Sequence, residues 1–296
     1  MAEVLATEAD ERASAVPAPA PVAGADVPAR RGRGRPPSRL FDLRGELPGT
    51  WRLVLSGVGM LGVFGLWLWV AGRGGDAGLV PSPAETLTAL RTQWQEGTLS
   101  TDFGASVGRI AVGYAISIAF GVVVGVAIGS LRSVEATLEA PIGFMRYVPA
   151  TALTPLLLLW MGIGEAPKIT LIAVGTVFFN ILMVADVARN VPRELLEASY
   201  TLGATRRTVL RRVVLRHSLP GIIDVARINL AAGWLMLVVA ELLAAQEGLA
   251  FRIVRAQRFR QVDTMFGMLI VFGVIGMASD LTLRKLRDVT SPWARP

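Results

Sequence analysis

The sequence contains no cysteine and a single histidine, His217, among its 296 residues. The lack of cysteine excludes disulfide scaffolds, iron–sulfur clusters and thiol nucleophiles, and one histidine is too few for a histidine-rich metal site. The two lysines, Lys168 and Lys285, follow proline and arginine, so the chain lacks the Gly-Lys-Ser/Thr segment of a phosphate-binding P-loop. We therefore expect this chain to contain no catalytic residue, no metal site and no cofactor of its own.

Charge is also scarce in this chain. Only 18% of the residues are charged, below the roughly 25% of an average soluble domain, whereas 52% are hydrophobic and the mean hydropathy is +0.51. The apolar residues gather in runs between charges, and a run of roughly 20 residues can cross a bilayer. Because backbone groups in hydrocarbon must be satisfied internally, each run is expected to be helical. The predicted spans are 52–72, 105–130, 145–164, 168–187, 221–244 and 263–283.

The predicted fold class is therefore an all-α membrane protein with about six transmembrane helices, formed by residues 51–288. A short external helix is expected between the first two spans, within residues 79–102. Its start is marked by Ser82 as a capping residue, with Pro83 at the first helical position and Glu85 three residues after the cap.

Glycines recur at every fourth residue of the second predicted span, at Gly121, Gly125 and Gly129. This spacing places them on one face of a helix and lets another helix backbone approach closely. The neighbour can be a helix of the same chain, which we favour, or a helix across a dimer interface or gate.

The distribution of basic residues predicts the orientation in the membrane. With the N-terminus in the cytoplasm, 22 of the 30 basic residues lie in cytoplasmic segments and 8 lie outside, so the positive-inside rule favours two cytoplasmic termini. Half of the external basic residues form one cluster that departs from this trend. An external basic rim can attract an anionic solute or an acidic patch of a partner, or it can anchor on lipid headgroups. The rim consists of Arg252, Arg255, Arg258 and Arg260.

The first 50 residues differ from the rest of the chain. They are rich in alanine and proline and contain the basic stretch Arg30–Pro37, so we expect a disordered cytoplasmic tail, with a second short tail at 289–296. The basic stretch leaves two functions open. One is a membrane-tethered regulator that binds nucleic acid through the tail; the other, which we favour, is contact with anionic lipid. No nucleic-acid partner is expected.

The segment 190–220 lies between the fourth and fifth predicted spans, on the cytoplasmic side. It predicts an amphipathic helix, a turn at Gly203 in which glycine follows the last helical residues, and a second, basic amphipathic helix. Pro220 is expected to open the fifth span. A helical hairpin of this kind can dock a cytosolic partner or lie on the lipid surface.

Ionisable residues inside a membrane are costly and mark candidate functional positions. Glu241 lies toward the outer half of the fifth predicted span, where it can stabilise an external gate or pair with a basic residue. Arg146 lies at the start of the third predicted span, before Pro149, and can meet an anion near the inner mouth or anchor the chain. We take Arg146, Pro149 and Glu241 as candidate pathway residues.

The 190–220 segment resembles the "EAA" loop of binding-protein-dependent ABC transporter permeases. The similarity rests on Glu197-Ala198-Ser199, Gly203 and Leu219-Pro220. Further segments resemble the branch of this family that serves nitrate, sulfonates, taurine and bicarbonate. They are Val80-Pro81-Ser82-Pro83, Arg146-Tyr147-Val148-Pro149, Leu156–Gly164, Ala240-Glu241, Gly248-Leu249 and Asp280.

This resemblance implies the type I ABC importer permease fold in a bacterial cytoplasmic membrane. It implies a permease that moves a small solute, an anion of the kinds named above, and that works with three partners: cytosolic ATPase subunits that bind ATP and Mg²⁺, a second permease copy, and an extracytoplasmic solute-binding protein. It also assigns the residues that couple the permease to its ATPase. They are Glu194, Glu197, Ala198, Ser199, Gly203, Ala204, Leu219 and Pro220.

Overall fold

The computed structural model of the protein describes residues 49–73 and 79–294. The predicted N-terminal tail lies outside the described residues, except for its last two positions, and so do residues 295–296 of the predicted C-terminal tail. The chain divides into two units, Met1–Leu61 and Gly62–Pro296. Helix α2 (Gly49–Arg73) begins in the first unit and ends in the second.

Within residues 49–73 and 79–294, five helices are long and apolar enough to cross a membrane. Five of the six predicted spans are thereby confirmed as membrane-length helices, although the second starts earlier and the fifth is longer than predicted. The five helices are α2, α4 (Thr98–Ser130), α7 (Glu165–Arg189), the continuous helix Arg206–Leu242 and α12 (Val262–Thr290).

The predicted start of the second span, at residue 105, is wrong because α4 begins at Thr98. The charged residues Asp102 and Arg109 interrupt the apolar run at this point. Both side chains are instead buried and paired inside the protein. The helix therefore continues for two more turns toward its N-terminus than hydropathy indicates.

The third predicted span, 145–164, is wrong as a single helix. Helix α5 (Arg132–Met145) is followed by a turn and then by the 3-10 helix η3 (Ala150–Leu153) and helix α6 (Thr154–Met161), and the two parts are bent by 79°. Pro149 caps η3 with an extended backbone. Proline lacks an N–H and disfavours helical geometry at the residue before it, which explains the break. This bent pair provides the sixth candidate span.

The short helix predicted between the first two spans is confirmed as α3 (Pro83–Gln95), and its external location stays a prediction. The Ser82 hydroxyl accepts from the Glu85 N–H at 3.2 Å, and the Glu85 carboxylate accepts from the Ser82 N–H at 2.7 Å, which completes a capping box. The hydrogen bond from the Ser82 backbone lowers the pKa of Glu85. Because that pKa lies below its unfolded value, the cap stabilises the helix at higher pH and this contribution is lost as pH falls through the folded pKa.

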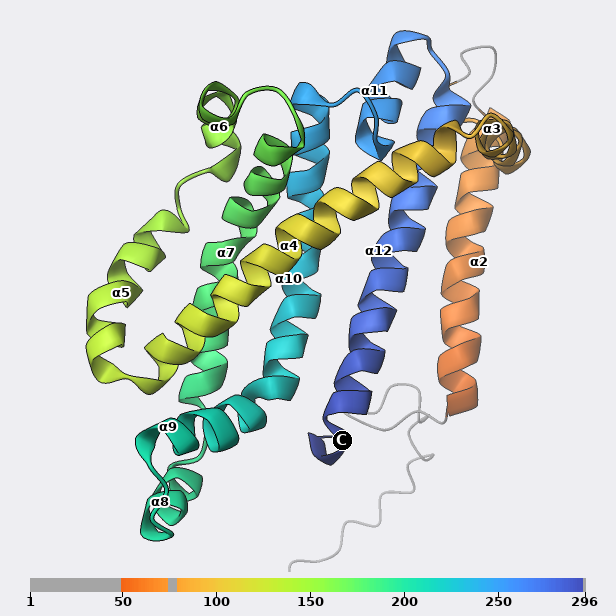
Figure 1. Cartoon of the computed structure of the whole chain (residues 1–296). Helices are drawn as coiled ribbons and strands as arrows, with labels where there is room; N and C mark the ends of the chain where they lie inside the picture. Colours follow the sequence, from red (N-terminus) through yellow and green to blue (C-terminus); the bar gives the residue numbers. More distant parts are fainter. Residues whose placement is uncertain (1–48, 74–78, 295–296) are drawn as a thin grey trace, which may run out of the picture. The chain divides into compact units, whose positions relative to one another are not determined.

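Helix α4 packs along α7 through a stripe of small residues (Figure 1). A Cβ added at Gly125 would lie 2.6 Å from the Ile181 carbonyl oxygen, and one added at Gly121 would lie 2.8 Å from Asn180 Cβ. The glycine stripe therefore serves close packing within the chain, the alternative that the sequence favoured. Ser117 belongs to the same stripe, and its hydroxyl accepts hydrogen bonds from the Asn180 amide and the Thr176 hydroxyl, both at 2.8 Å.

The fifth span does not begin at Pro220, contrary to prediction. Helix α9 (Arg206–Thr208), the π-helical segment η4 (Val209–Val214) and α10 (Leu215–Ala244) follow one another without a break, and Pro220 lies inside α10. A proline within a membrane helix is tolerated where its surroundings satisfy the freed backbone groups. Within the second unit, α8 (Arg193–Thr201) and α9 lie at one end of the helices and α11 (Leu249–Arg258) lies at the other (Figure 1).

Candidate functional site: a helical hairpin and a buried ionic network

The 190–220 hairpin turns at Gly203. The Gly203 N–H donates to the Tyr200 carbonyl at 2.9 Å, and the Ala204 N–H donates to the Ser199 carbonyl at 3.0 Å. With φ of +78° at Gly203, these bonds form the Schellman motif that ends a helix. The predicted role of Gly203 in the turn is confirmed, because a residue with a Cβ is strained at this φ.

The apolar side of the hairpin is anchored on the ends of the membrane helices. Val191, Val209 and Val214 are buried in a cluster with Val126 of α4 and Val184 of α7. Other apolar residues pack around this cluster, among them Leu196, Ala204, Leu210 and Val213. The hairpin therefore has a fixed base rather than a loose tether, and predicted Ala204 belongs to this base.

Other residues of the hairpin are exposed. Leu202, next to the turn, is 88% exposed and Tyr200 is also exposed. The predicted coupling residues Glu194, Glu197 and Ala198 are exposed on α8. Within the described residues, this surface combines carboxylates with large apolar side chains that have no covering element.

The remaining predicted coupling residues have structural partners. The Ser199 hydroxyl donates to the Leu195 carbonyl at 2.6 Å within α8. Leu219 and Pro220 are half-buried in α10. The structure thus brings Glu194, Glu197 and Ala198 together on one exposed helix and leaves Leu219 and Pro220 out of that surface.

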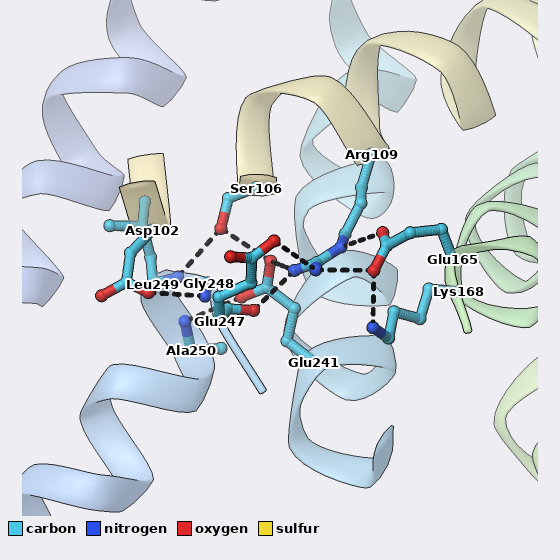
Figure 2. A network of polar contacts seen from close by, with 10 residues as sticks. All are labelled: Asp102, Ser106, Arg109, Glu165, Lys168, Glu241, Glu247, Gly248, Leu249 and Ala250. Atoms are coloured by element: carbon cyan, nitrogen blue, oxygen red, sulfur yellow. Dashed lines mark hydrogen bonds and ion pairs between the residues drawn. The ribbon is translucent and has the colours of Figure 1, made fainter. Parts of the chain in front are cut away.

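A buried ionic network lies at the other end of the second unit, where three long helices meet (Figure 2). Arg109 of α4 is 3% exposed and binds Glu165 of α7 through two nitrogens, Nε–Oε2 at 2.5 Å and Nη2–Oε1 at 2.9 Å. Its Nη1 donates to Glu241 Oε1 of α10 at 2.9 Å and to the Glu247 carbonyl at 2.7 Å. Lys168 adds a second cation beside Glu165, at 2.7 Å. We call these residues, with Asp102 and Ser106, the Arg109 network.

The Arg109 network also binds the start of α11 through hydrogen bonds. Three successive backbone N–H groups donate to side chains: Gly248 to Asp102 at 2.8 Å, Leu249 to Ser106 at 2.9 Å and Ala250 to Glu241 at 2.9 Å. Gly248 has φ of +130°, and a Cβ added at this residue would overlap the Glu241 carboxylate. The first turn of α11 is therefore fixed to α4 and α10.

Glu241 pairs with a basic residue, which is one of the two roles predicted for it. The sequence did not indicate which basic residue this is, and the structure shows that it is Arg109. A usable signal was present: Asp102, Ser106 and Arg109 are spaced by four and three residues, which places them on one face of a helix. An Asp, a Ser and an Arg on one helical face indicate a buried polar contact rather than a boundary.

The other predicted residues are dispersed. Arg146 ends α5, stacks on Tyr147 with its guanidinium 5.0 Å from the ring centroid, and donates to the Tyr147 hydroxyl at 3.0 Å; Pro149 is exposed at the bend before η3. Neither lies in the Arg109 network.

The predicted basic rim requires a correction at one residue. Arg252 is not a free rim cation, because its Nε binds Asp102 Oδ2 at 2.5 Å and its side chain is 13% exposed. A helix places residues 252 and 255 near one face. Because the start of α11 lies against α4, Arg252 turns inward, toward Asp102. Arg255, Arg258 and Arg260 are exposed.

Comparison with known proteins identifies the family to which the chain belongs. Residues 117–293, more than half of the chain, match the family described as "Binding-protein-dependent transport system inner membrane component". The chain is 31% identical over 245 residues to a probable ABC transporter permease of Brucella melitensis, covering 81% of this chain and 98% of that protein. It is 35% identical over 220 residues to the taurine transport permease TauC of Escherichia coli, covering 72% and 80%.

Solved structures agree with the fold. An inward-facing structure of the MetNI methionine ABC transporter matches with a TM-score of 0.58 at 21% identity, over 65% of this chain and 95% of that chain. This likeness confirms the predicted permease fold, and the family places the protein in the cytoplasmic membrane as a multi-pass component. The chain belongs to the family of binding-protein-dependent transport system inner membrane components, the permeases of ABC importers.

Proposed function

We propose that this permease couples to a separate ATPase through its 190–220 hairpin. The observation that carries this proposal is the anchored hairpin itself, whose base is buried and whose surface of Glu194, Glu197, Tyr200 and Leu202 is exposed. An anchored helix with an uncovered apolar tip is suited to enter a groove on another protein. Because the chain has no P-loop, ATP and Mg²⁺ would be bound by that partner.

The proposed orientation puts the hairpin in the cytosol, with both chain termini on that side, and the Arg109 network at the extracytoplasmic end. It is supported by the excess of basic residues in the segments assigned to the cytoplasm. A solute-binding protein would dock at the Arg109 end, and a second copy of the permease would complete the pathway.

The proposed solute is a small organic sulfonate. Relatives support this class: besides TauC, the chain is 30% identical over 232 residues to a putative aliphatic sulfonates permease of Bacillus subtilis, covering 78% of this chain and 84% of that protein. We expect cells with the intact transporter to take up labelled taurine, and unlabelled alkanesulfonates to compete. Competition by nitrate or bicarbonate but not by sulfonates would contradict this solute class.

The variant Gly203→Val tests the coupling role of the hairpin. Valine is strained at φ of +78°, so the Schellman turn should distort and displace Leu202 and Tyr200. We expect uptake to fall by at least about tenfold, the effect of roughly 1.4 kcal/mol, with unchanged abundance in the membrane. The measurement is uptake of the labelled solute together with an immunoblot of the membrane fraction.

A matched control for this variant is Gly143→Val, in α5. Gly143 has no positive φ and an added Cβ meets nothing within 4 Å, so uptake should stay near the level of the unmodified protein. Co-purification of the ATPase should separate docking from folding: we expect less ATPase with Gly203→Val and the normal amount with Gly143→Val. Normal uptake and normal ATPase recovery with Gly203→Val would refute the docking role.

A further inference from the structure

We propose that the cavity between the end of α10 and α11 is a binding site for an oxyanion that carries a short apolar tail. The cavity has a volume of about 460 Å³, within the range of roughly 300–1,000 Å³ of small-molecule sites. Arg255 and Arg258 line it together with Phe251, Val254 and Phe259. Two guanidinium groups beside aromatic and aliphatic side chains are the chemistry that an organic oxyanion requires.

The two arginines have no partner within the described part of the chain. Neither Arg255 nor Arg258 makes an ion pair or hydrogen bond there, and both are exposed. Their spacing of three residues puts them on one face of α11, where like charges repel. An anion between them would remove this repulsion and accept hydrogen bonds from both groups.

The Glu241 carboxylate in the cavity wall does not neutralise Arg255 and Arg258. Glu241 lines the cavity, but its Oε1 already accepts from Ser106 at 2.6 Å and from Arg109 at 2.9 Å, and its Oε2 accepts from the Ala250 N–H. The charge of Glu241 is thus committed to Arg109. Of the charged side chains that line the cavity, Arg255 and Arg258 remain for an anion, although Arg255 also borders the neighbouring hollow that is lined by Glu85, Glu96 and Asp263.

The Arg109 network also fixes the position of the two arginines. Three backbone bonds and the Arg252–Asp102 pair hold the first turn of α11, and Ala256 is buried between Arg255 and Arg258. A helix held in this way loses little freedom when a ligand binds, which favours affinity. The apolar wall formed by Phe251 and Val254 would favour an oxyanion with a carbon chain over an inorganic one.

This inference rests on the proposed function for the identity of the solute, and on the cavity alone for the existence of the site. The test therefore measures binding without transport. The full chain in phosphatidylcholine nanodiscs is titrated with butanesulfonate, with inorganic sulfate and with butylammonium. We expect butanesulfonate to bind more tightly than sulfate and butylammonium not to bind.

The variants Arg255→Gln and Arg258→Gln should each weaken butanesulfonate binding by about tenfold, because each removes a charge-assisted contact. The matched control is Arg260→Gln, an exposed arginine that does not line the cavity, and it should bind as the unmodified protein does. Size-exclusion profiles of all three variants should coincide, since each side chain is exposed.

Two kinds of result would overturn the site. Unchanged binding in the two cavity variants, or an equal loss with Arg260→Gln, would assign binding to another place or to general surface charge. Binding of phosphatidylglycerol that depends on the two arginines, with no butanesulfonate binding in phosphatidylcholine, would assign the cavity to a lipid headgroup. Butanesulfonate binding in a protein that does not transport sulfonates would contradict the proposed solute and leave the site intact.

Discussion

Replacing Arg109 by methionine is expected to destabilise the folded protein by about 3–5 kcal/mol, the usual cost of removing one partner of a buried ion pair. The reason is Glu241, which is 1% exposed and would lose the cation that faces it at 2.9 Å, so that its buried carboxylate would be left either charged without a counterion or protonated at a cost. Glu165 would lose its partner too, but it is half-exposed and retains Lys168. Thermal unfolding in detergent, followed by the yield of monodisperse protein, measures the loss.

Two further variants isolate the cause. Arg91→Met removes an exposed arginine of α3 and should leave the unfolding temperature nearly unchanged. The double variant Arg109→Met with Glu241→Gln removes the stranded charge and should recover part of the stability that Arg109→Met loses. Equal stability of Arg109→Met and the unmodified protein would mean that the Arg109 network does not hold these helices together.

A second large effect is expected at the contact between α4 and α7. In Gly125→Leu the new Cβ would lie 2.6 Å from the Ile181 carbonyl oxygen and would also come close to Val184. Backbone atoms cannot rotate away, so the helices must separate, at a cost of about 3 kcal/mol, the upper end of ordinary overpacking. The yield of folded protein and its unfolding temperature should both fall sharply.

The control for this variant lies in the same helix. Gly108 is exposed and an added Cβ would meet nothing within 4 Å. Gly108→Leu should be neutral or stabilise α4 by up to about 1 kcal/mol, because glycine is a poor helix former. If both variants unfold at the same temperature, the stripe does not set the distance between α4 and α7.

Hydropathy and capping predicted most of the helices because both depend on neighbouring residues. The capping box at Ser82 and the turn at Gly203 could be predicted from the sequence for the same reason, because each needs one residue type at one position. The bend near Pro149 and the unbroken helix through Pro220 were predicted wrongly. Both sites contain a proline, and its effect on a helix depends on the packing around it, which a local pattern does not contain.

The candidate site was predictable at the hairpin and not at the Arg109 network. The hairpin is contiguous in sequence, so amphipathic pattern and turn residue identify it. The network joins Asp102, Glu165 and Glu241, which are far apart in the chain. Only the packing of α4 against α7 and α10 brings them together, and that packing also turns Arg252 away from the surface on which it was predicted.

The continuity of the helix from Arg206 to Leu242 has a mechanical consequence. Its 37 residues carry the hairpin at one end and reach the Arg109 network at the other. The helix changes direction between α9 and α10 (Figure 1), but no loop interrupts it, so a displacement of the hairpin is transmitted to α10 through continuous helical turns. Compliance is confined to the two places where the regular hydrogen-bond ladder is interrupted, the π-helical turn 209–214 and Pro220. Stiffening those few residues should matter more to the transmission of force than any change along the straight remainder of α10.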